Sequence, residues 1–563
     1  MSTSRTRPWL SSYAPGVPAD IEIPEGSLPD LLDGAVQRFA DLVALDFYGA
    51  TLTYARLGEQ VARAAEALRR LGVGQGDRVA LVMPNCPQHV VAFYAVLRLG
   101  AVVVEHNPLY TDEELAYQLA DHGARVVVAW DKIVPALHRI ADRTQVQTIV
   151  AVDLTAALPL TKRWALRLPV ARARATRAAL TGPAPDALSW AAILGAAEPL
   201  SLDHPRPGAT DIALLQYTGG TTGVPKGAML THRNLWSNAR QGRAWVPGLQ
   251  DGREVVYAVL PMFHAYGLTL CLTFAVAIGA TLVLFPRFDV DQTLEAMRRR
   301  PATFVPGVPP IYAALAEAAV TRGADLSSIR FAISGAMALP PPLVAQWESV
   351  TGGLLVEGYG MTETSPISVG NPVADTRRPG TIGVPFPSTD VRVSHRDDPA
   401  LDCPTGEPGE LLVRGPQVFA GYWNRPADTA AVLLDDGWIR TGDIVVMDAD
   451  GFITVVDRIK ELIITGGFNV YPSEVETALR RVAGVAEAAV VGLPHESKGE
   501  RVVAVVVAEP GTTLDPEAVR AASRQHLAGY KVPHQVVVVE DLPRSLIGKV
   551  LHRTVREDLL RRG

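Results

Sequence analysis

Short runs of Val, Ile and Leu alternate with segments of helical periodicity through most of the first 380 residues. The stretch that begins at Asp77 illustrates the pattern: DRVALVMPN predicts a strand, CPQHVVAFYAVLRLG a helix and AVVVEHN the next strand. Strands and helices that alternate in this way pack as α/β units around largely parallel sheets. We therefore expect an α/β body for this part of the chain.

The pattern changes in the C-terminal third. From about residue 381 to 457, short strands separated by turns, such as GELLVRG and GFITVVD, predict a small antiparallel barrel or sheet. A compact α+β tail of about 100 residues follows, which is large enough to have its own core. Because 563 residues exceed what one core supports, we expect two domains. The first, residues 1–459, would hold two α/β subdomains and the small β-barrel, and the second, 460–563, would be a small mobile α+β domain.

Charge, cysteine content and hydropathy exclude several classes of protein. The net charge of −6 argues against a dedicated nucleic-acid binder, which would carry a basic face. Three cysteines far apart do not form a disulfide framework or a metal cluster, so we expect a reducing, cytoplasmic location. The most apolar window, residues 267–285, is broken by GAT and predicts a buried helix followed by a buried strand rather than a membrane span.

One segment, residues 154–185, contains no acidic residue and an unusual number of cations. Trp164, Leu166 and Leu168 lie among them. A basic amphipathic segment can lie on an anionic membrane surface, which would make the protein peripheral on the inner face of a membrane. We favour a solvated insertion, because charge runs are usually solvated, and the membrane contact remains the alternative. The basic residues are Lys162, Arg163, Arg167, Arg172, Arg174 and Arg177.

A glycine- and threonine-rich stretch, TGGTTGVPK at residues 218–226, predicts an anion-binding loop. Glycines allow successive backbone N–H groups to turn toward one centre, and the threonine hydroxyls and Lys226 add further donors. A polyphosphate is the natural ligand. The loop does not match the P-loop motif G-x-x-x-x-G-K-[ST], because Lys226 follows Pro225 and Gly227 replaces the Ser or Thr that would bind magnesium.

This loop, followed by GAMLTHRN, resembles the signature of the adenylate-forming superfamily, which includes acyl-CoA synthetases, luciferases and peptide-synthetase adenylation domains. Further blocks match in the order of that family, so the resemblance covers essentially the whole chain. These blocks are PMFHAYG (261–267), ISGAMALP (333–340), EGYGMTETSP (357–366), GWIRTGDI (437–444), DRIKELIITGGFNVYPSEVE (457–476) and PRSLIGKVLHR (543–553).

The resemblance implies a two-step reaction. A carboxylate attacks the α-phosphate of ATP to form an acyl-adenylate and pyrophosphate, and a thiol, usually that of CoA, then attacks the acyl carbonyl and expels AMP. ATP, CoA and Mg²⁺ are therefore the implied co-substrates and cofactor, with a carboxylic acid as the substrate. A homodimer is compatible with this assignment.

The same resemblance assigns residues to the ATP site. The implied catalytic residues are Thr218, Lys226, Glu363 and Lys549, with Thr218 and Glu363 as magnesium ligands. Asp443 is the expected acceptor for the ribose hydroxyls. The implied ATP- and AMP-binding residues are Thr218, Gly219, Gly220, Thr221, Thr222, Gly223, Lys226, Gly335, Ala336, Glu357, Gly358, Tyr359, Gly360, Met361, Thr362, Asp443, Val455 and Arg458.

The C-terminal motifs imply a second conformation. Lys549 would stabilise charge during adenylation, although PRSLIGK departs slightly from the pattern of the family in its SLI positions. Lys460 matches the hinge about which the small domain would rotate. The rotation would remove Lys549 and bring in a face bordering the CoA path, formed by Gly466, Gly467 and Phe468.

The identity of the acid is less constrained. GFNVYPSEVE, the N-terminal RPWLSSYAPGVPADIE and the basic segment resemble medium- to long-chain fatty acyl-CoA synthetases. The expected acyl pocket includes His264, Gly307 and Gly335, and a second interpretation of His264 is a satisfied core residue.

Three alternatives remain: a fatty acyl-AMP ligase that loads a carrier protein, a coumarate-type aryl-CoA ligase, and a non-catalytic acyl-adenylate-binding relative. The intact Lys226, Glu363, Asp443 and Lys549 argue against the last.

Overall fold

The structure is a computed structural model that forms two compact units. The larger contains Trp9–Asp390 and Arg414–Ile439, and the smaller is built mainly from Val391–Val413 and Arg440–Gly563. The structure describes residues 7–218, 224–458, 461–465, 468–495, 499–527, 529–545 and 548–562.

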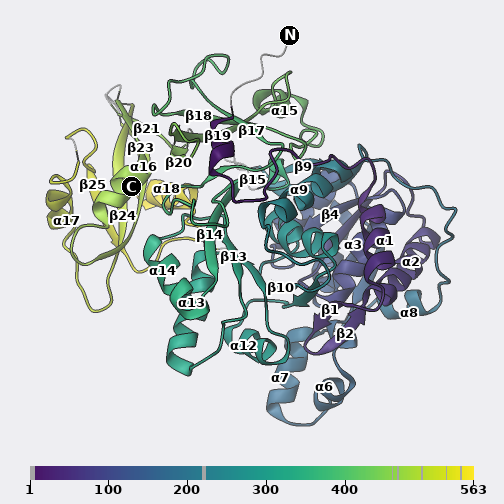
Figure 1. The fold of residues 1–563 in the computed structure, drawn as a ribbon. Coiled ribbons are helices and arrows are strands. Elements are labelled where there is room, and N and C mark those ends of the chain that lie inside the picture. The colour runs from purple at the N-terminus through teal and green to yellow at the C-terminus, as the bar shows by residue number, and fades with distance from the viewer. Residues whose placement is uncertain are drawn as a thin grey trace. The chain divides into compact units, whose positions relative to one another are not determined.

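A nine-stranded sheet forms one half of the larger unit (Figure 1). The strands from β14 to β1 run parallel, whereas β2, β15 and β16 pair antiparallel at the two ends of the sheet. In their order in the sheet, the strands are β16 (Val384–Pro385), β15 (Ile367–Gly370), β14 (Leu354–Gly360), β13 (Phe331–Ser334), β12 (Phe304–Gly307), β10 (Val255–Ala258), β11 (Thr281–Leu284), β1 (Val43–Phe47) and β2 (Ala50–Thr53).

A seven-stranded sheet forms the other half of this unit. Only β9 runs antiparallel to its neighbour, β8, and the other described pairs are parallel. The order is β7 (Leu188–Ser189), β6 (Thr148–Val152), β5 (Val126–Trp130), β3 (Arg78–Val82), β4 (Val102–His106), β8 (Ile212–Thr218) and β9 (Lys226–Thr231). The predicted α/β body with largely parallel sheets is confirmed.

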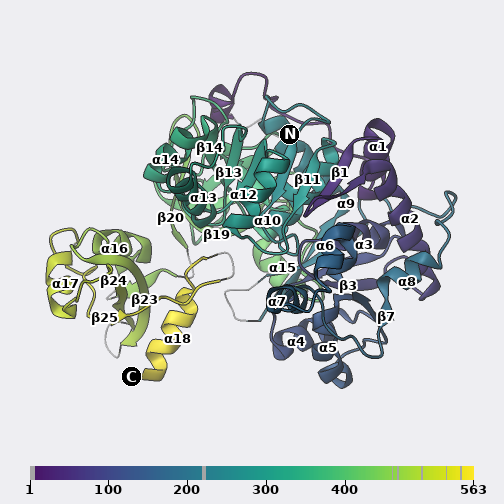
Figure 2. The same cartoon turned by 90° about the horizontal axis from the view of Figure 1, so that it is seen from below.

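Helices cover both faces of the seven-stranded sheet. Helix α3 (Pro87–Arg98) lies against β3 and β4 and is buried from Gln88 to Arg98, which explains its nearly continuous apolar sequence. On the opposite face, α4 (Asp112–His122) and α5 (Val134–Arg139) lie side by side and pack apolar residues against β3 and β5 (Figure 2). The predicted strand–helix–strand unit after residue 77 is therefore present.

Most of the remaining helices of the larger unit pack on one another, on α3 or on the sheets, whereas α6 and α7 contain no buried residue. In Figure 1, α13 and α14 lie beside β13 and β14. These helices are α1 (Leu28–Phe39), α2 (Tyr54–Arg70), α6 (Leu160–Ala165), α7 (Ala171–Leu180), α8 (Trp190–Gly195), α9 (His232–Trp245), α10 (Ala265–Gly267), α11 (Phe274–Ala277), α12 (Val290–Arg299), α13 (Pro309–Arg322), α14 (Pro341–Thr351) and α15 (Pro426–Val432).

The apolar window 267–285 is a buried helix followed by a buried strand, as predicted. A π-helical segment, Leu268–Thr273, joins α10 to α11, and β11 follows. Among the described residues, no helix is both long and apolar enough to cross a membrane.

The smaller unit holds two sheets. The expected small β structure is a four-stranded sheet of β17 (Asp390–Ser394), β18 (Gly409–Arg414), β19 (Ile439–Met447) and β20 (Ile453–Arg458). The second sheet has the order β22 (Phe468–Val470), β21 (Ile463–Thr465), β24 (Gly499–Ala508) and β23 (Val485–His495), and β25 (Gln535–Val539) pairs with β24. Three helices accompany it: α16 (Pro472–Leu479), α17 (Pro516–Ser523) and α18 (His552–Arg562).

The two sheets of the smaller unit are joined by direct contacts. Ser473, at the start of α16, donates its backbone N–H to the carboxylate of Asp457 on β20 at 3.1 Å. Its hydroxyl also donates to the Val456 carbonyl. The predicted domain boundary at residues 459–460 lies outside the described residues and stays a prediction.

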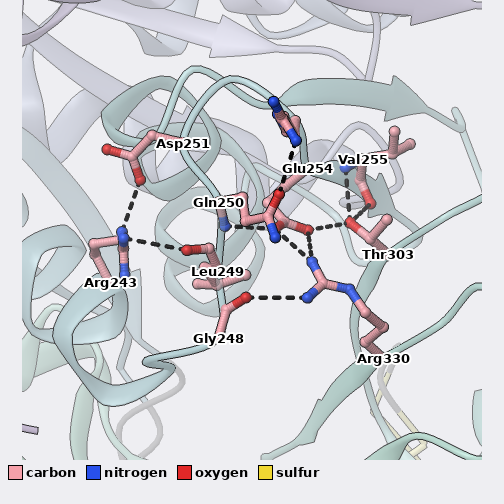
Figure 3. Close-up of polar contacts among 10 residues, drawn as sticks. Arg243, Gly248, Leu249, Gln250, Asp251, Glu254, Val255, Thr303 and Arg330 are labelled. Atoms are coloured by element: carbon pink, nitrogen blue, oxygen red, sulfur yellow. Dashed lines mark hydrogen bonds and ion pairs between the residues drawn. The ribbon is translucent and has the colours of Figure 1, made fainter. Parts of the chain in front are cut away.

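A buried carboxylate joins three parallel strands of the nine-stranded sheet at their N-terminal ends (Figure 3). The side chain of Glu254, just before β10, is fully buried. It accepts from Nη2 of Arg330, just before β13, at 2.6 and 2.8 Å, and from the hydroxyl of Thr303, just before β12. The backbone N–H of Gln250 also donates to Glu254 at 2.7 Å, and Arg330 donates to the Gly248 carbonyl at 3.0 Å. These hydrogen bonds hold the starts of β10, β12 and β13 together.

Replacing Arg330 with Met should lower the free energy of unfolding by about 2–4 kcal/mol, because the Glu254 carboxylate would stay buried without its cation. Guanidinium unfolding monitored by circular dichroism measures the change. Arg253→Met is the matched control, because the exposed Arg253 contacts only the Gln250 side chain at 3.4 Å. Equal unfolding midpoints for the two variants would contradict this role of Glu254.

Candidate active site

The predicted phosphate loop connects two antiparallel strands at one edge of the seven-stranded sheet. The register pairs Thr218, the last residue of β8, with Lys226, the first residue of β9. Two of the predicted phosphate-binding residues therefore face each other where the loop begins and ends. The other predicted loop residues, Gly219, Gly220, Thr221, Thr222 and Gly223, lie outside the described residues.

Helix α4 holds the chain on both sides of this loop. On the first side, the hydroxyl of Tyr217 donates to Oδ2 of Asp121 at 2.6 Å. On the second side, the hydroxyl of Tyr117 donates to the Pro225 carbonyl at 3.2 Å. The sequence analysis did not identify these supports, because α4 is about 100 residues before the loop in the chain.

Two neutral histidines pack against the ring of Tyr217. The backbone N–H of Ala124 donates to Nδ1 of His122 at 3.2 Å, so the proton of neutral His122 is on Nε2. His122 then donates to Nε2 of His106 at 3.0 Å, and His106 donates from Nδ1 to Gln118 at 2.9 Å. Burial lowers the pKa of His106 to about 4 and that of His122 well below its usual value.

Lys226 is linked to Glu363, the predicted metal ligand, through a tyrosine. The ammonium of Lys226 forms an ion pair with Asp428 on α15 and lies 5.3 Å from the ring centroid of Tyr422. The hydroxyl of Tyr422 donates to Oε1 of the buried Glu363 at 2.6 Å. Tyr422 and Asp428 were missed by the sequence analysis, which did not single out GYWNRPADT.

The segment that carries Tyr422 and Asp428 also contacts α4. The indole N–H of Trp423 donates to the Asp121 carbonyl at 3.3 Å, and Arg425 donates to the hydroxyl of Tyr117 at 3.2 Å. The loop supports and the partners of Lys226 thus belong to one hydrogen-bonded assembly.

The two motifs ISGAMALP and EGYGMTETSP meet at the C-terminal ends of β13 and β14. The register pairs Ser334, the last residue of β13, with Glu357 of β14, so Gly335 and Ala336 lie beside the C-terminal half of β14. Ala336 has a φ of +65°, which turns the chain sharply after β13. The predicted nucleotide residues that line one common cavity there are Gly335, Ala336, Glu357, Gly358, Tyr359, Gly360, Met361 and Thr362.

The cavity is small, and aromatic side chains form part of its wall. Its volume is about 80 Å³, below the roughly 300–1,000 Å³ of most ligand pockets. Trp245 and Phe386 stack with ring centroids 4.3 Å apart on its wall, and Tyr266 lies beside them. Burial raises the pKa of Glu357, which also lines the cavity, to about 7. A bulky ligand therefore requires these rings to move.

Two of the three predicted acyl-pocket residues line this cavity, and the third lies next to it in contact with Tyr266. His264 and Gly335 line the cavity. A side chain at Gly335 would meet the ring of Tyr266 at 3.0 Å, so this glycine permits the close approach of the tyrosine. Gly307 does not line the cavity, but its carbonyl accepts from the hydroxyl of Tyr266 at 3.1 Å. The Nδ1 atom of His264 accepts from the backbone N–H of Tyr266 at 3.3 Å, and burial lowers its pKa.

The predicted ribose-binding residues lie in the smaller unit. Asp443 on β19 is buried and directly opposite Arg458 on β20 in the antiparallel ladder. Val455, on the same strand as Arg458, is 37% exposed. The sequence-predicted pair Asp443 and Arg458 is therefore brought together by local strand pairing.

The remaining predictions concern the C-terminal tail. Lys549 lies on a turn, where its backbone N–H donates to the Ser545 hydroxyl at 3.1 Å and its carbonyl accepts from the Ser545 N–H at 2.7 Å. Phe468 begins β22. Lys460, Gly466 and Gly467 lie outside the described residues.

The histidine pair should make the protein sensitive to acid. The folded pKa of each histidine is lowered, so the unfolded chain takes up protons first as the pH falls from about 6.5 to 4, and stability falls in that window. His106→Asn should remove about one of the protons taken up on unfolding. The slope of the unfolding free energy against pH then falls by about 1.4 kcal/mol per pH unit. Denaturant unfolding at pH 5 to 7 measures the slope. The exposed His395 provides the control His395→Asn, and an unchanged slope in His106→Asn would be contrary to expectation.

Comparison with known proteins identifies related sequences over the whole chain. A family model described as AMP-binding enzyme matches residues 32–423, and one described as AMP-binding enzyme C-terminal domain matches residues 474–549. A long-chain-fatty-acid–CoA ligase of Bacillus subtilis (strain 168) is 39% identical over 553 residues, covering 98% of each chain. A feruloyl-CoA synthase of an Amycolatopsis species is 38% identical over 509 residues, 90% of this chain and 94% of that one.

A solved structure agrees with these sequence matches. The crystal structure of ATP-bound MatB from Rhodopseudomonas palustris superimposes with a TM-score of 0.81 at 31% identity, covering 94% of this chain and 98% of that one. Its fold is shared across nearly all of both chains. The chain therefore belongs to the AMP-binding enzyme family.

Proposed function

We propose that the chain is an ATP-dependent fatty acid–CoA ligase of the AMP-forming type. It joins a carboxylic acid to CoA through an acyl-adenylate, and ATP and CoA are its co-substrates. The relationship to a long-chain-fatty-acid–CoA ligase over 98% of both chains supports this function. The observation that carries it is the Lys226–Tyr422–Glu363 arrangement beside a largely apolar cavity, because adenylation brings an acid to a polyphosphate.

In the first step the loop after β8 binds the phosphates of ATP. Lys226 supplies positive charge, and the backbone N–H groups of residues 219–223 supply donors. Lys226 is paired with Asp428 in the structure, so a phosphate that binds the ammonium competes with this carboxylate. Asp428 holds the ammonium at the start of β9 until ATP arrives.

Mg²⁺ suits the oxygen donors of Glu363 and Thr218. Glu363 offers a buried carboxylate and Thr218 a hydroxyl, which are hard oxygen ligands, and Mg²⁺ usually binds one or two carboxylates together with substrate phosphates. When bound, the ion neutralises charge on the phosphates.

The acyl group occupies the cavity after β13 and β14. Trp245, Tyr266 and Phe386 offer an apolar wall, and each buried methylene contributes about 0.8 kcal/mol. We therefore assign a medium- or long-chain acid as the substrate, with the rings displaced to admit it. An aryl acid is the second candidate, because the same rings can stack on an aromatic substrate and the feruloyl-CoA synthase is 38% identical.

Residues of the smaller unit are assigned to both steps of the reaction. Asp443 and Arg458 bind the ribose and phosphate of the nucleotide, and Lys549 stabilises charge as the acid attacks the α-phosphate. Rotation about Lys460 then exchanges Lys549 for the Gly466–Phe468 segment, which borders the CoA path. The resemblance in the C-terminal motifs supports these assignments, and the family match to residues 474–549 includes Lys549.

The test of the function is product formation from ATP and a panel of short, medium, long and aryl acids, each with and without CoA. We expect AMP release to depend on CoA and acyl-CoA to accumulate with fatty acids of medium or long chain. Preferential turnover of an aryl acid would favour the second candidate. Adenylate that forms without transfer to CoA would place the chain among carrier-loading ligases, and no turnover with any acid would contradict the proposal.

Replacing Tyr422 with Phe should raise the Mg²⁺ concentration needed for half-maximal activity by about 10-fold, because residues that orient a metal ligand typically contribute 10–100-fold to affinity. Tyr48→Phe is the matched control, since the Tyr48 hydroxyl donates to Gln292, away from the loop, at 2.7 Å. An Mg²⁺ dependence equal to wild type would exclude Tyr422 as a positioning residue.

Lys549→Ala should lower adenylate formation by about 100-fold or more while preserving thioester formation from supplied acyl-AMP. Pyrophosphate release and acyl-CoA formation are assayed separately. Lys531→Ala removes another lysine of the same tail and should affect neither half-reaction. Loss of both half-reactions in Lys549→Ala would be inconsistent with separate conformations for the two steps.

A further inference from the structure

The basic segment 154–185 folds into two short helices that bury no side chain. Helices α6 and α7 project from the edge of the larger unit, at the bottom of Figure 1 and toward the viewer in Figure 2. Helix stability in proteins comes mostly from burying one face, so helices without a buried face are unusual. Their Ala- and Arg-rich sequences favour the helix locally, but packing does not explain why they are retained.

Large apolar side chains are exposed along α6 and in the connection to α7. The exposed fractions are 70% for Leu160, 66% for Trp164, 54% for Leu168 and 52% for Val170. Leu160 and Trp164 are four residues apart and share one face of α6. Helical hydrogen bonds continue to Leu168, whose N–H donates to the Ala165 carbonyl at 3.2 Å, so Leu168 lies one turn further on. Together they form an apolar strip on the surface.

Cations flank this strip. In the part of the chain that the structure describes, Arg163, Arg172, Arg174 and Arg177 make no ion pair. The guanidinium of Arg167 lies over the ring of Trp164 at 5.0 Å from its centroid. A sixth cation, Lys162, pairs with Glu295 of α12 at 3.3 Å.

The segment is attached to the body at its C-terminal end. The indole N–H of Trp130 donates to the Leu180 carbonyl at 2.8 Å, and Lys132 donates to the Ala178 carbonyl at 2.8 Å. The hydroxyl of Thr181 also donates to Asp131. The exposed strip and its arginines are therefore presented on a fixed support and not on a loose loop.

We propose that α6, α7 and their connection form a docking surface for an anionic lipid bilayer. Trp and Leu side chains enter the interface between head groups and acyl chains, while arginines bind lipid phosphates from the sides. Each cation near an anionic leaflet adds to the attraction between the segment and the membrane. The net charge of −6 makes the remaining surface acidic, so the bilayer selects this face. The docking does not depend on which acid the enzyme activates.

The experiment is sedimentation of the full-length protein with vesicles of phosphatidylcholine, with or without 30% phosphatidylglycerol. The test variant replaces Arg163, Arg172, Arg174 and Arg177 with Gln. The control replaces four exposed arginines elsewhere, Arg253, Arg481, Arg524 and Arg562, with Gln, so that the net charge changes equally. A third variant, Trp164→Ala, tests the apolar strip.

We expect wild type and control to bind the anionic vesicles, more weakly at high salt, and not those of phosphatidylcholine alone. The test variant should bind at least about 10-fold more weakly, and Trp164→Ala should bind more weakly than wild type. The proposal would be overturned if the test variant and the control lost vesicle binding to the same extent, or if wild type bound equally to anionic vesicles and to vesicles of phosphatidylcholine alone.

Two further measurements separate the remaining outcomes. If the surface binds a second copy of the chain, sedimentation velocity will show a dimer that the test variant loses without any wild-type binding to vesicles, and the proposal fails. Turnover of a soluble medium-chain acid should be equal in wild type and the test variant. Failure of the proposed ligase function would leave the vesicle result unaffected.

Discussion

The buried carboxylate of Glu254 holds three parallel strands together, and residues that follow two of them, β10 and β13, line the cavity. Its bonds to Arg330 and Thr303 hold the N-terminal ends of β10, β12 and β13 together. Parallel strands that begin in register also end in register, so their C-terminal residues converge on one edge of the sheet, where α/β proteins bind ligands. The motif residues after β13 and β14 line the cavity at that edge. A charge buried at one end of the sheet thereby supports the position of the residues that line the cavity at the other.

The phosphate loop depends on a second set of polar contacts. A glycine-rich loop has little packing of its own, so its geometry depends on what holds its two sides. Tyr217 and Pro225 on these sides are both bonded to α4, and Tyr422 and Asp428 contact Lys226 from a segment about 200 residues later. These supports lie outside the glycine-rich motif. They hold the described residues on the two sides of the loop, Tyr217 and Pro225, in fixed positions.

Much of the fold and part of the candidate site were accessible from the sequence. The alternation of apolar runs and helices predicted the parallel sheets, and the break at GAT predicted the helix and strand of 267–285, because local periodicity reports which face is buried. Asp443 and Arg458 are opposed because strands close in sequence pair directly. The assigned roles of these residues stay predictions. Tyr422, Asp428 and Asp121 were not found, because their partners are about 60 to 200 residues away in the chain.

The sequence alone determined the family, the α/β class and the chemistry implied by its ordered motifs, because these depend on residue type and short spacing. Only the tertiary structure decided which side chains meet. It paired Lys226 with Asp428, linked Tyr422 to Glu363, and enclosed a cavity with Trp245 and Phe386. It also left Trp164 and its arginines exposed on short helices. Such contacts are set by how distant elements pack, and local sequence does not specify that packing residue by residue.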